Sequence, residues 1–192
     1  TFISQNEKQL SIDNFQFSST KTDSIRDFSI RSNLVSFIAR GDFEFTTLSQ
    51  DLKLLLKEYE LKLSNDQNEI DRYYTQKEQG ENYEIRFKLN LTDTKPLFDL
   101  FYPSVSISPG TILKGRFSNS RTSMLEINSS FNSIQVDNIT LSQNEIDILT
   151  SKKRYSNELL ASYSISSEKQ RIGIKSIAKD FNLSGLWDNT AF

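Results

Sequence analysis

The chain has 192 residues and a net charge of −2, contains neither Cys nor His, and is 36% apolar. Without those two residue types it has no disulfide, no thiol nucleophile, no Cys/His zinc site and no His-dependent catalytic triad. A pI of about 5.3 leaves no basic stripe for phosphate backbones, so we expect no nucleic-acid partner.

The choice of apolar residues favours strands over helices. The chain has only 4 Ala, against 18 Ile, 14 Phe and 7 Tyr. Ala is the best helix former, whereas Ile, Phe and Tyr suit pleated, half-buried surfaces. We therefore expect a β protein and not a helical bundle.

Short segments in which apolar and polar residues alternate recur along the chain. The longest covers residues 83–91, where charged or amide side chains occupy every second position. Such alternation is typical of a strand with one buried and one wet face, in an antiparallel sheet. Candidate turns separate such segments at residues 128–130, 137–138 and 143–144.

One stretch follows helical spacing instead. Apolar residues from Leu48 to Tyr59, Leu56 among them, form an amphipathic stripe, and Thr47 resembles the start of a capping box. A shorter helical turn is predicted over residues 96–101, because proline suits the first position of a helix. We therefore expect one continuous β segment over residues 1–192 with a helical and polar insertion at about 47–82.

Residues 11–18 share a pattern with residues 135–142. Both contain an Asp-Asn pair, Asp13-Asn14 and Asp137-Asn138, between pieces in which apolar residues alternate. The match predicts one strand–turn unit used twice, as in an elongated array.

No pattern in the sequence predicts a catalytic or metal site. Asp13 and Asp137 are the best-placed carboxylates, but each precedes Asn in a turn-like context, where such side chains cap the local backbone. The chain has no calcium loop, glycine-rich nucleotide loop or nucleophile elbow. We therefore predict that the protein is not an enzyme and uses no metal or cofactor.

What remains is a continuous apolar face. It is either the core of a closed β-sandwich or the wall of a groove that holds acyl chains. An apolar share below the usual range favours an elongated shape with a thin interior. The candidate groove residues are Phe15, Phe17, Phe28, Ile30, Phe43, Phe45, Ile85, Phe87, Leu89, Leu91, Ile107, Leu125, Ile127, Ile139, Leu141, Ile165, Ile174 and Phe181.

Three blocks carry a resemblance to a known family. They read FKLNL at residues 87–91, PLFDLFYP at 96–103 and ISPGTILKGRF at 107–117. With residues 24–32 and the strand series that ends at Trp187, they resemble the TamB family. That family is the inner-membrane-anchored subunit of the translocation and assembly module of Gram-negative bacteria, related to AsmA-like proteins.

The resemblance implies an elongated, U-shaped, mostly antiparallel sheet (a β-taco) with an apolar inner groove and one or two short helices. It implies a periplasmic location and the transport of phospholipid between inner and outer membranes. Because the chain starts at Thr1 and no membrane anchor is recognisable, we expect a middle piece of such a protein. A second implied role is a scaffold for outer-membrane protein assembly with a TamA-type barrel partner.

Overall fold

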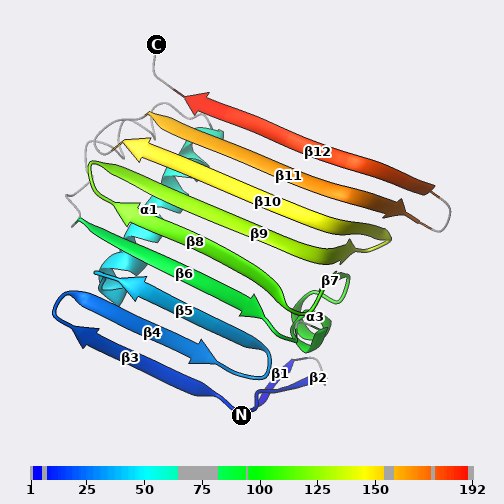
Figure 1. Cartoon of the computed structure of the whole chain (residues 1–192), viewed down its shortest axis with the longest axis horizontal. Helices are drawn as coiled ribbons and strands as arrows, with labels where there is room; N and C mark the ends of the chain where they lie inside the picture. The colour runs from blue at the N-terminus through cyan, green and yellow to red at the C-terminus, as the bar shows by residue number, and fades with distance from the viewer. Residues whose placement is uncertain are drawn as a thin grey trace.

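One large antiparallel sheet dominates the computed structural model, which describes residues 2–5, 8–64, 82–93, 95–153, 158–173 and 176–189 (Figure 1). The sheet has 10 strands in the order β12-β11-β10-β9-β8-β6-β5-β4-β3, with β7 paired to β9, while β1 and β2 form a separate ribbon. The strands are β1 (Phe2–Gln5), β2 (Lys8–Ser11), β3 (Gln16–Thr22), β4 (Ile25–Arg31), β5 (Val35–Gly41), β6 (Tyr83–Leu91), β7 (Val105–Ile107), β8 (Thr111–Asn119), β9 (Thr122–Val136), β10 (Ile139–Lys153), β11 (Leu159–Ile172) and β12 (Ser176–Asn189).

Within the described ranges, two helices accompany the sheet. Helix α1 (Phe45–Ser64) lies across one face of the sheet, and the short helix α3 (Lys95–Phe101) lies near the β1–β2 ribbon (Figure 1). The predicted fold class is confirmed: an elongated, unclosed, mostly antiparallel sheet with two helices, consistent with a taco-like fold. Both predicted helical stretches are confirmed, and residues 65–81 of the expected insertion lie outside the described part.

The register gives the sheet two faces of different chemistry. Ile85, Phe117 and Leu125 stand directly opposite one another on β6, β8 and β9, and Leu55 of α1 packs in the same cluster. We call this side the helix-side face. Arg86 of β6 stands opposite Arg116 of β8, next to the Ile85–Phe117 pair. Because successive side chains of a strand point to opposite sides, these two arginines project from the other side of the sheet, which we call the polar face.

The main core cluster lies between α1 and the sheet. The predicted stripe of α1 supplies Leu55, which is buried, whereas Leu56 is 66% exposed and so lies off the contact. Successive residues of a helix point about 100° apart, so a contact centred on Leu55 leaves Leu56 at its margin. The other buried members are Ala39, Phe43, Tyr83, Ile85 and Phe117, and Leu48, Leu52 and Tyr59 of α1 pack against them.

Two polar contacts fix the position of α1 on the sheet. Glu58 Oε2 lies 3.5 Å from Lys152 Nζ of β10, and these side chains are 1% and 2% exposed. Nearer the start of the helix, Asn119 Nδ2 donates a hydrogen bond of 2.8 Å to Asp51 Oδ2. Moving the helix would take the Glu58 carboxylate away from a buried ammonium, which is costly in a low-dielectric interior.

A second, smaller cluster closes the opposite end of the sheet. Leu10 of β2, Leu34 and Leu100 of α3 are all buried together. Val35 packs against this cluster, and its register opposite Leu91 places it on the helix-side face. The helix-side face is therefore bounded by packed elements at both ends of its strands.

Two of the predicted turns are wrong. Residues 128–130 lie inside β9 and residues 143–144 inside β10, each a strand of 15 residues. Two polar side chains of the first stretch have partners within the sheet: Asn128 donates to Asp147, and Ser129 donates to the carbonyl oxygen of Ile112. Gln143 has a φ of 55°, a left-handed conformation that interrupts the alternation without ending the strand.

The predicted repeat does not form one unit used twice. Residues 137–138 close the β9–β10 hairpin, with a φ of 51° at Asp137. Asp13 and Asn14 instead connect β2 of the ribbon to β3 at the edge of the large sheet. The Asp13 carboxylate accepts a 3.0 Å hydrogen bond from Ser11 Oγ, which is a side-chain partner, so the expected capping of local backbone stays a prediction.

The buried ion pair yields a first prediction. Replacing Glu58 by Leu leaves the buried Lys152 ammonium without its carboxylate, so we expect the free energy of unfolding to fall by about 3–5 kcal/mol. The double variant Glu58→Leu/Lys152→Met removes both charges, and we expect it to regain most of that loss. Urea unfolding followed by circular dichroism measures both values.

The exposed pair Lys95–Asp99 on α3 is the control, with side chains 76% and 51% exposed. Asp99→Asn removes the same kind of contact, and we expect a change below about 0.5 kcal/mol because solvent screens the pair. A double variant at residues 58 and 152 as unstable as the single one would contradict the role given to the pair.

The buried Tyr83 and the half-buried Tyr59 yield a second prediction. Burial raises the pKa of the Tyr83 phenol above its ordinary range, the Asp51 carboxylate acts in the same direction, and burial also raises the pKa of Tyr59. Tyrosines of the unfolded chain ionise near pH 10, so this contribution to stability is present below about pH 10 and is lost as the pH rises further. Unfolding at a series of alkaline pH values measures the loss, which we expect to be smaller in Tyr83→Phe.

Candidate functional site

Part of the helix-side face remains uncovered by the described elements, between α1 and the cluster at Leu100. There apolar residues follow one another from strand to strand at matching register positions: Ile127 opposite Ile148, and Ile146 opposite Ile165. All are half-buried by their lateral neighbours. We call this surface the apolar strip, and it consists of Phe87, Leu89, Leu113, Ile127, Ile146, Ile148, Ile165 and Leu183.

Two aromatic rings lie over glycines and keep the apolar strip continuous. A Cβ on Gly115 of β8 would stand 2.2 Å from Phe87 Cζ, so the Phe87 ring already occupies that space. In the same way, a Cβ on Gly185 of β12 would meet the Tyr163 hydroxyl at 2.5 Å. Each ring covers backbone that a glycine leaves bare, a known device for stabilising glycine in strands.

Aromatic rings continue the apolar surface toward the β3 edge. Phe28 of β4 has edge-on ring contacts with Phe17, Phe37 and Phe45, with centroids 5.0–5.9 Å apart. Phe17 lies on the edge strand and is 61% exposed. Such ring pairs add specific stabilisation to the area that they bury. The apolar surface therefore reaches the open edge of the sheet without a polar break.

The structure brings most of the predicted groove residues to one face. Phe43 and Ile85 are buried under α1, and Phe45 begins that helix, so these three are core or wall residues. The predicted residues that the register places on the helix-side face are Phe17, Phe28, Ile30, Ile85, Phe87, Leu89, Leu91, Leu125, Ile127, Ile165 and Phe181.

The remaining predicted residues lie elsewhere. Phe15 precedes β3 and is 58% exposed. Ile139 and Leu141 lie beyond the left-handed Gln143, at the β9–β10 hairpin, where Ile107 of β7 pairs with β9. Ile174 is outside the described residues. The apolar surface therefore stops short of the β9–β10 hairpin, although the sequence predicted that Ile139 and Leu141 belong to it.

Several residues of the helix-side face escaped the sequence-based selection. Phe37 lies in β5, where Ile38 and Ala39 blur the alternation, and Leu113 lies in β8, where Gly115 interrupts it. Ile146, Ile148 and Leu183 do alternate, and extending the selection to every alternating segment would have included them. The signal was present, but short segments leave the choice of face ambiguous.

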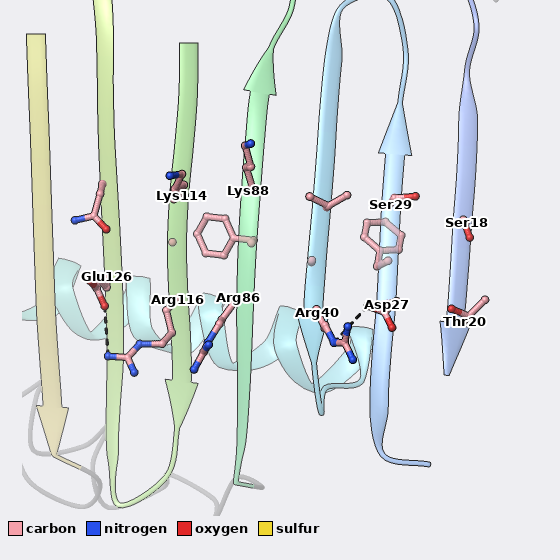
Figure 2. A pocket seen from close by; sticks show the side chains of 16 residues that line it. Ser18, Thr20, Asp27, Ser29, Arg40, Arg86, Lys88, Lys114, Arg116 and Glu126 are labelled. Carbon is pink, nitrogen blue, oxygen red and sulfur yellow. Dashed lines mark ion pairs between the residues drawn. The ribbon is translucent and has the colours of Figure 1, made fainter. Parts of the chain in front are cut away.

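The polar face carries a concentration of positive charge. Arg40, Arg86 and Arg116 stand directly opposite one another on three adjacent strands, and Lys88 stands opposite Lys114 two residues further along. They line a hollow of about 720 Å³ on the side of the sheet away from α1 (Figure 2). The sequence predicted that Arg86 and Lys88 face water, and the structure places them on this hollowed surface.

Comparison with known proteins gives no relative: no family model, curated protein or solved structure matches the chain. The TamB resemblance therefore remains a prediction. Within the described ranges, neither helix combines the length and apolarity needed to cross a membrane.

The glycines yield a third prediction. Gly115→Ala places a methyl group against the end of the Phe87 ring, which can rotate, so we expect a loss of about 1–2 kcal/mol in unfolding free energy. A Cβ on Gly41 would stand 1.9 Å from the backbone oxygen of Glu84, which cannot rotate away. We therefore expect a larger loss for Gly41→Ala, of about 3 kcal/mol or more.

Combining each change with Phe87→Leu isolates the ring contact. We expect Phe87→Leu to relieve part of the loss at Gly115 and none of the loss at Gly41, as measured by urea unfolding of the single and double variants. Equal relief at both positions would show that the ring over Gly115 is not the cause.

Proposed function

We propose that this chain is a segment of a periplasmic, TamB-like lipid conduit that carries phospholipid acyl chains along the apolar strip between the inner and outer membranes. The observation that supports the proposal is the continuity of that strip, from Phe87 on β6 to Leu183 on β12, on a sheet that does not close. A monomeric soluble protein rarely leaves a contiguous apolar surface of this kind without a ligand or partner.

The dimensions of the strip suit an acyl chain. Strands in a sheet lie about 4.8 Å apart, so the eight strands from β4 to β12 extend the helix-side face over about 34 Å. A bilayer has a hydrocarbon core of about 30 Å, so the acyl chains of one leaflet occupy about 15 Å of it. An extended chain therefore fits on the strip with room to move along it.

The energetics suit movement as well as binding. Each CH2 group removed from water contributes roughly 0.8 kcal/mol, and less where only one side is covered. These contacts have no directional preference, so neighbouring positions along the strip have similar free energies. Sliding along such a wall requires neither a catalytic group nor a cofactor, and we accordingly propose a role other than enzymatic.

Neighbouring residues of β10 allow a matched test. Ile148 stands opposite Ile127 on the apolar strip, whereas Leu149 stands opposite Glu126 on the polar face and is 38% exposed. In Ile148→Asn and Leu149→Asn the same amide replaces an aliphatic side chain, on opposite faces of one strand. We expect Ile148→Asn to weaken binding of a fluorescent long-chain phospholipid by roughly tenfold, a loss of about 1.5 kcal/mol, with Leu149→Asn nearly unchanged.

Binding is measured by fluorescence titration, after circular dichroism has shown that both variants are folded. Photo-crosslinking from position 148 with labelled phospholipid provides a second readout. Equal losses in the two variants, or no binding by the unchanged chain, would rule out the apolar strip as the acyl site.

The alternative role, a scaffold for outer-membrane protein assembly with a TamA-type barrel partner, rests on a different observation. Among the described elements no strand pairs with the outer edge of β3, whose residues are all exposed, or with that of β12. An open edge offers backbone groups to an incoming strand. Crosslinkers in β3 that capture an unfolded barrel protein instead of lipid would favour this role. A closed sandwich is disfavoured, because α1 and not a second sheet covers the core among the described elements.

A further inference from the structure

The hollow on the polar face is long and narrow. Its lining comes from six neighbouring strands, β3, β4, β5, β6, β8 and β9, whose side chains stand in two rows (Figure 2). Strands lie about 4.8 Å apart, so the hollow runs for about 24 Å across them. Its volume of about 720 Å³, spread over that length, gives a cross-section of about 30 Å². A site of this shape favours an elongated ligand over a compact one.

Cross-strand register sets the order of the side chains along the hollow. In order from β3 to β9, the first row consists of Thr20, Asp27, Arg40, Arg86, Arg116 and Glu126. Over the same strands, the second row consists of Ser18, Ser29, Ile38, Lys88, Lys114 and Asn128. The positive charges therefore lie on β5, β6 and β8, and neutral or acidic side chains lie at both ends.

Positive charge exceeds negative charge in the hollow. Five cationic side chains line it, against the two carboxylates of Asp27 and Glu126. The arginines have acidic partners within the chain, but Arg40 is 73% exposed beside Asp27, and Arg86 is 74% exposed beside Glu84. Solvent weakens ion pairs as exposed as these. Their guanidinium groups therefore remain accessible to a ligand.

The two lysines form the part of the hollow that attracts an anion most directly. Lys88 and Lys114 stand opposite each other on β6 and β8 (Figure 2). Among the residues that the structure describes, neither lysine forms an ion pair with an acidic side chain, whereas each arginine of the hollow does. Like charges directly opposite each other destabilise an antiparallel pair. Carboxylates of a ligand placed at these lysines would relieve that repulsion.

The end of the hollow at β3, β4 and β5 offers different contacts. Ile38 stands directly opposite Lys88 and is 42% exposed, so it presents aliphatic surface beside the lysines. Beyond it, Ser18 and Ser29 supply hydroxyl groups that both donate and accept hydrogen bonds. The Asp27 carboxylate repels a second anion at this end. The ligand that fits is therefore acidic over β6 and β8 and uncharged over β3 to β5.

An extended peptide has the required length and chemistry. Its residues advance about 3.3 Å each, so about seven residues cover the hollow, and every second side chain points toward the sheet. An α-helix with its side chains is about 10 Å or more across, which is wider than the hollow. A helix also satisfies its own backbone groups, whereas an extended segment needs partners for them, and the hydroxyl groups of the hollow supply such partners.

We propose that the hollow binds an extended, acidic peptide segment of about seven residues that lies across the strands. Its carboxylates contact Lys88 and Lys114, and an aliphatic side chain lies over Ile38. The hollow is on the opposite side of the sheet from the apolar strip, so this proposal does not depend on acyl-chain binding.

Isothermal titration calorimetry with blocked heptapeptides tests the proposal. In the peptide TSVSESE, threonine, valine and the two glutamates alternate with serine and so share one side of an extended chain. We expect it to bind roughly tenfold more tightly than TSVSQSQ, in which glutamine keeps the shape of each side chain and removes its charge. Replacing the valine by serine should weaken binding by a few-fold.

Variants of the chain locate the peptide. Lys88→Gln/Lys114→Gln should weaken binding of TSVSESE by roughly tenfold and leave that of TSVSQSQ unchanged. Ile38→Ser should weaken binding of TSVSESE but not of its valine-to-serine version. Lys169 and Lys179 are also directly opposite each other, outside the hollow, and serve as the control. Lys169→Gln/Lys179→Gln changes the net charge equally, and we expect it to leave binding unchanged; circular dichroism shows whether each variant is folded.

Several results would overturn the proposal. They are no binding of TSVSESE by the unchanged chain, equal affinity for TSVSESE and TSVSQSQ, and equal weakening in the two lysine double variants. Tighter binding of a helical acidic peptide would contradict the extended conformation. Lysine-dependent binding of phosphatidylglycerol vesicles or of a single-stranded oligonucleotide, without binding of the peptide, would show that the lysines contact a membrane or a nucleic acid instead.

Discussion

The placement of α1 on one end of an apolar sheet face determines what the rest of the molecule exposes. The helix buries its stripe against β5, β6 and β8, and the buried Glu58–Lys152 pair prevents it from settling nearer the middle of the strands. An apolar helix contact alone is non-directional and tolerates sliding. A buried ion pair does not tolerate sliding, because movement would separate its two charges and leave each of them buried without a partner. The uncovered strip thus follows from a polar contact inside the core.

A single layer of backbone separates the apolar helix-side face from the charged polar face. Strands β6 and β8 supply Phe87 and Leu113 to one side, and Lys88 and Lys114 to the other. The two sides have no side chain in common, so a ligand on one side does not compete directly with a ligand on the other. The carboxylates of Asp27 and Glu126 flank the basic residues and limit how far their positive field extends along the sheet.

The sequence predicted the elements whose signals lie within a few neighbouring residues, but not the contacts between residues far apart in the chain. Alternation identified β6, helical spacing identified α1, and proline placement identified α3, because these signals lie within a few residues. The end of the sheet that α1 covers depends on Glu58 meeting Lys152, far apart in the chain, and no local pattern encodes that contact. The polar residues at 128–130 were misread as a turn because their hydrogen bonds go to neighbouring strands, which the sequence does not display. The paired lysines were missed for the same reason, since cross-strand register sets their proximity.

A single-layer sheet with one apolar and one polar face also limits where residues can be inserted or deleted. Inserting one residue within β6 would exchange its two sets of side chains, placing Lys88 among leucines and Phe87 among arginines. Inserting two would restore the order, and inserting any number at a hairpin tip would leave it untouched. Gains and losses inside these strands are therefore restricted to even numbers, whereas the tips are free to vary. Length variation in this protein should accordingly concentrate along the two rims where the hairpins turn.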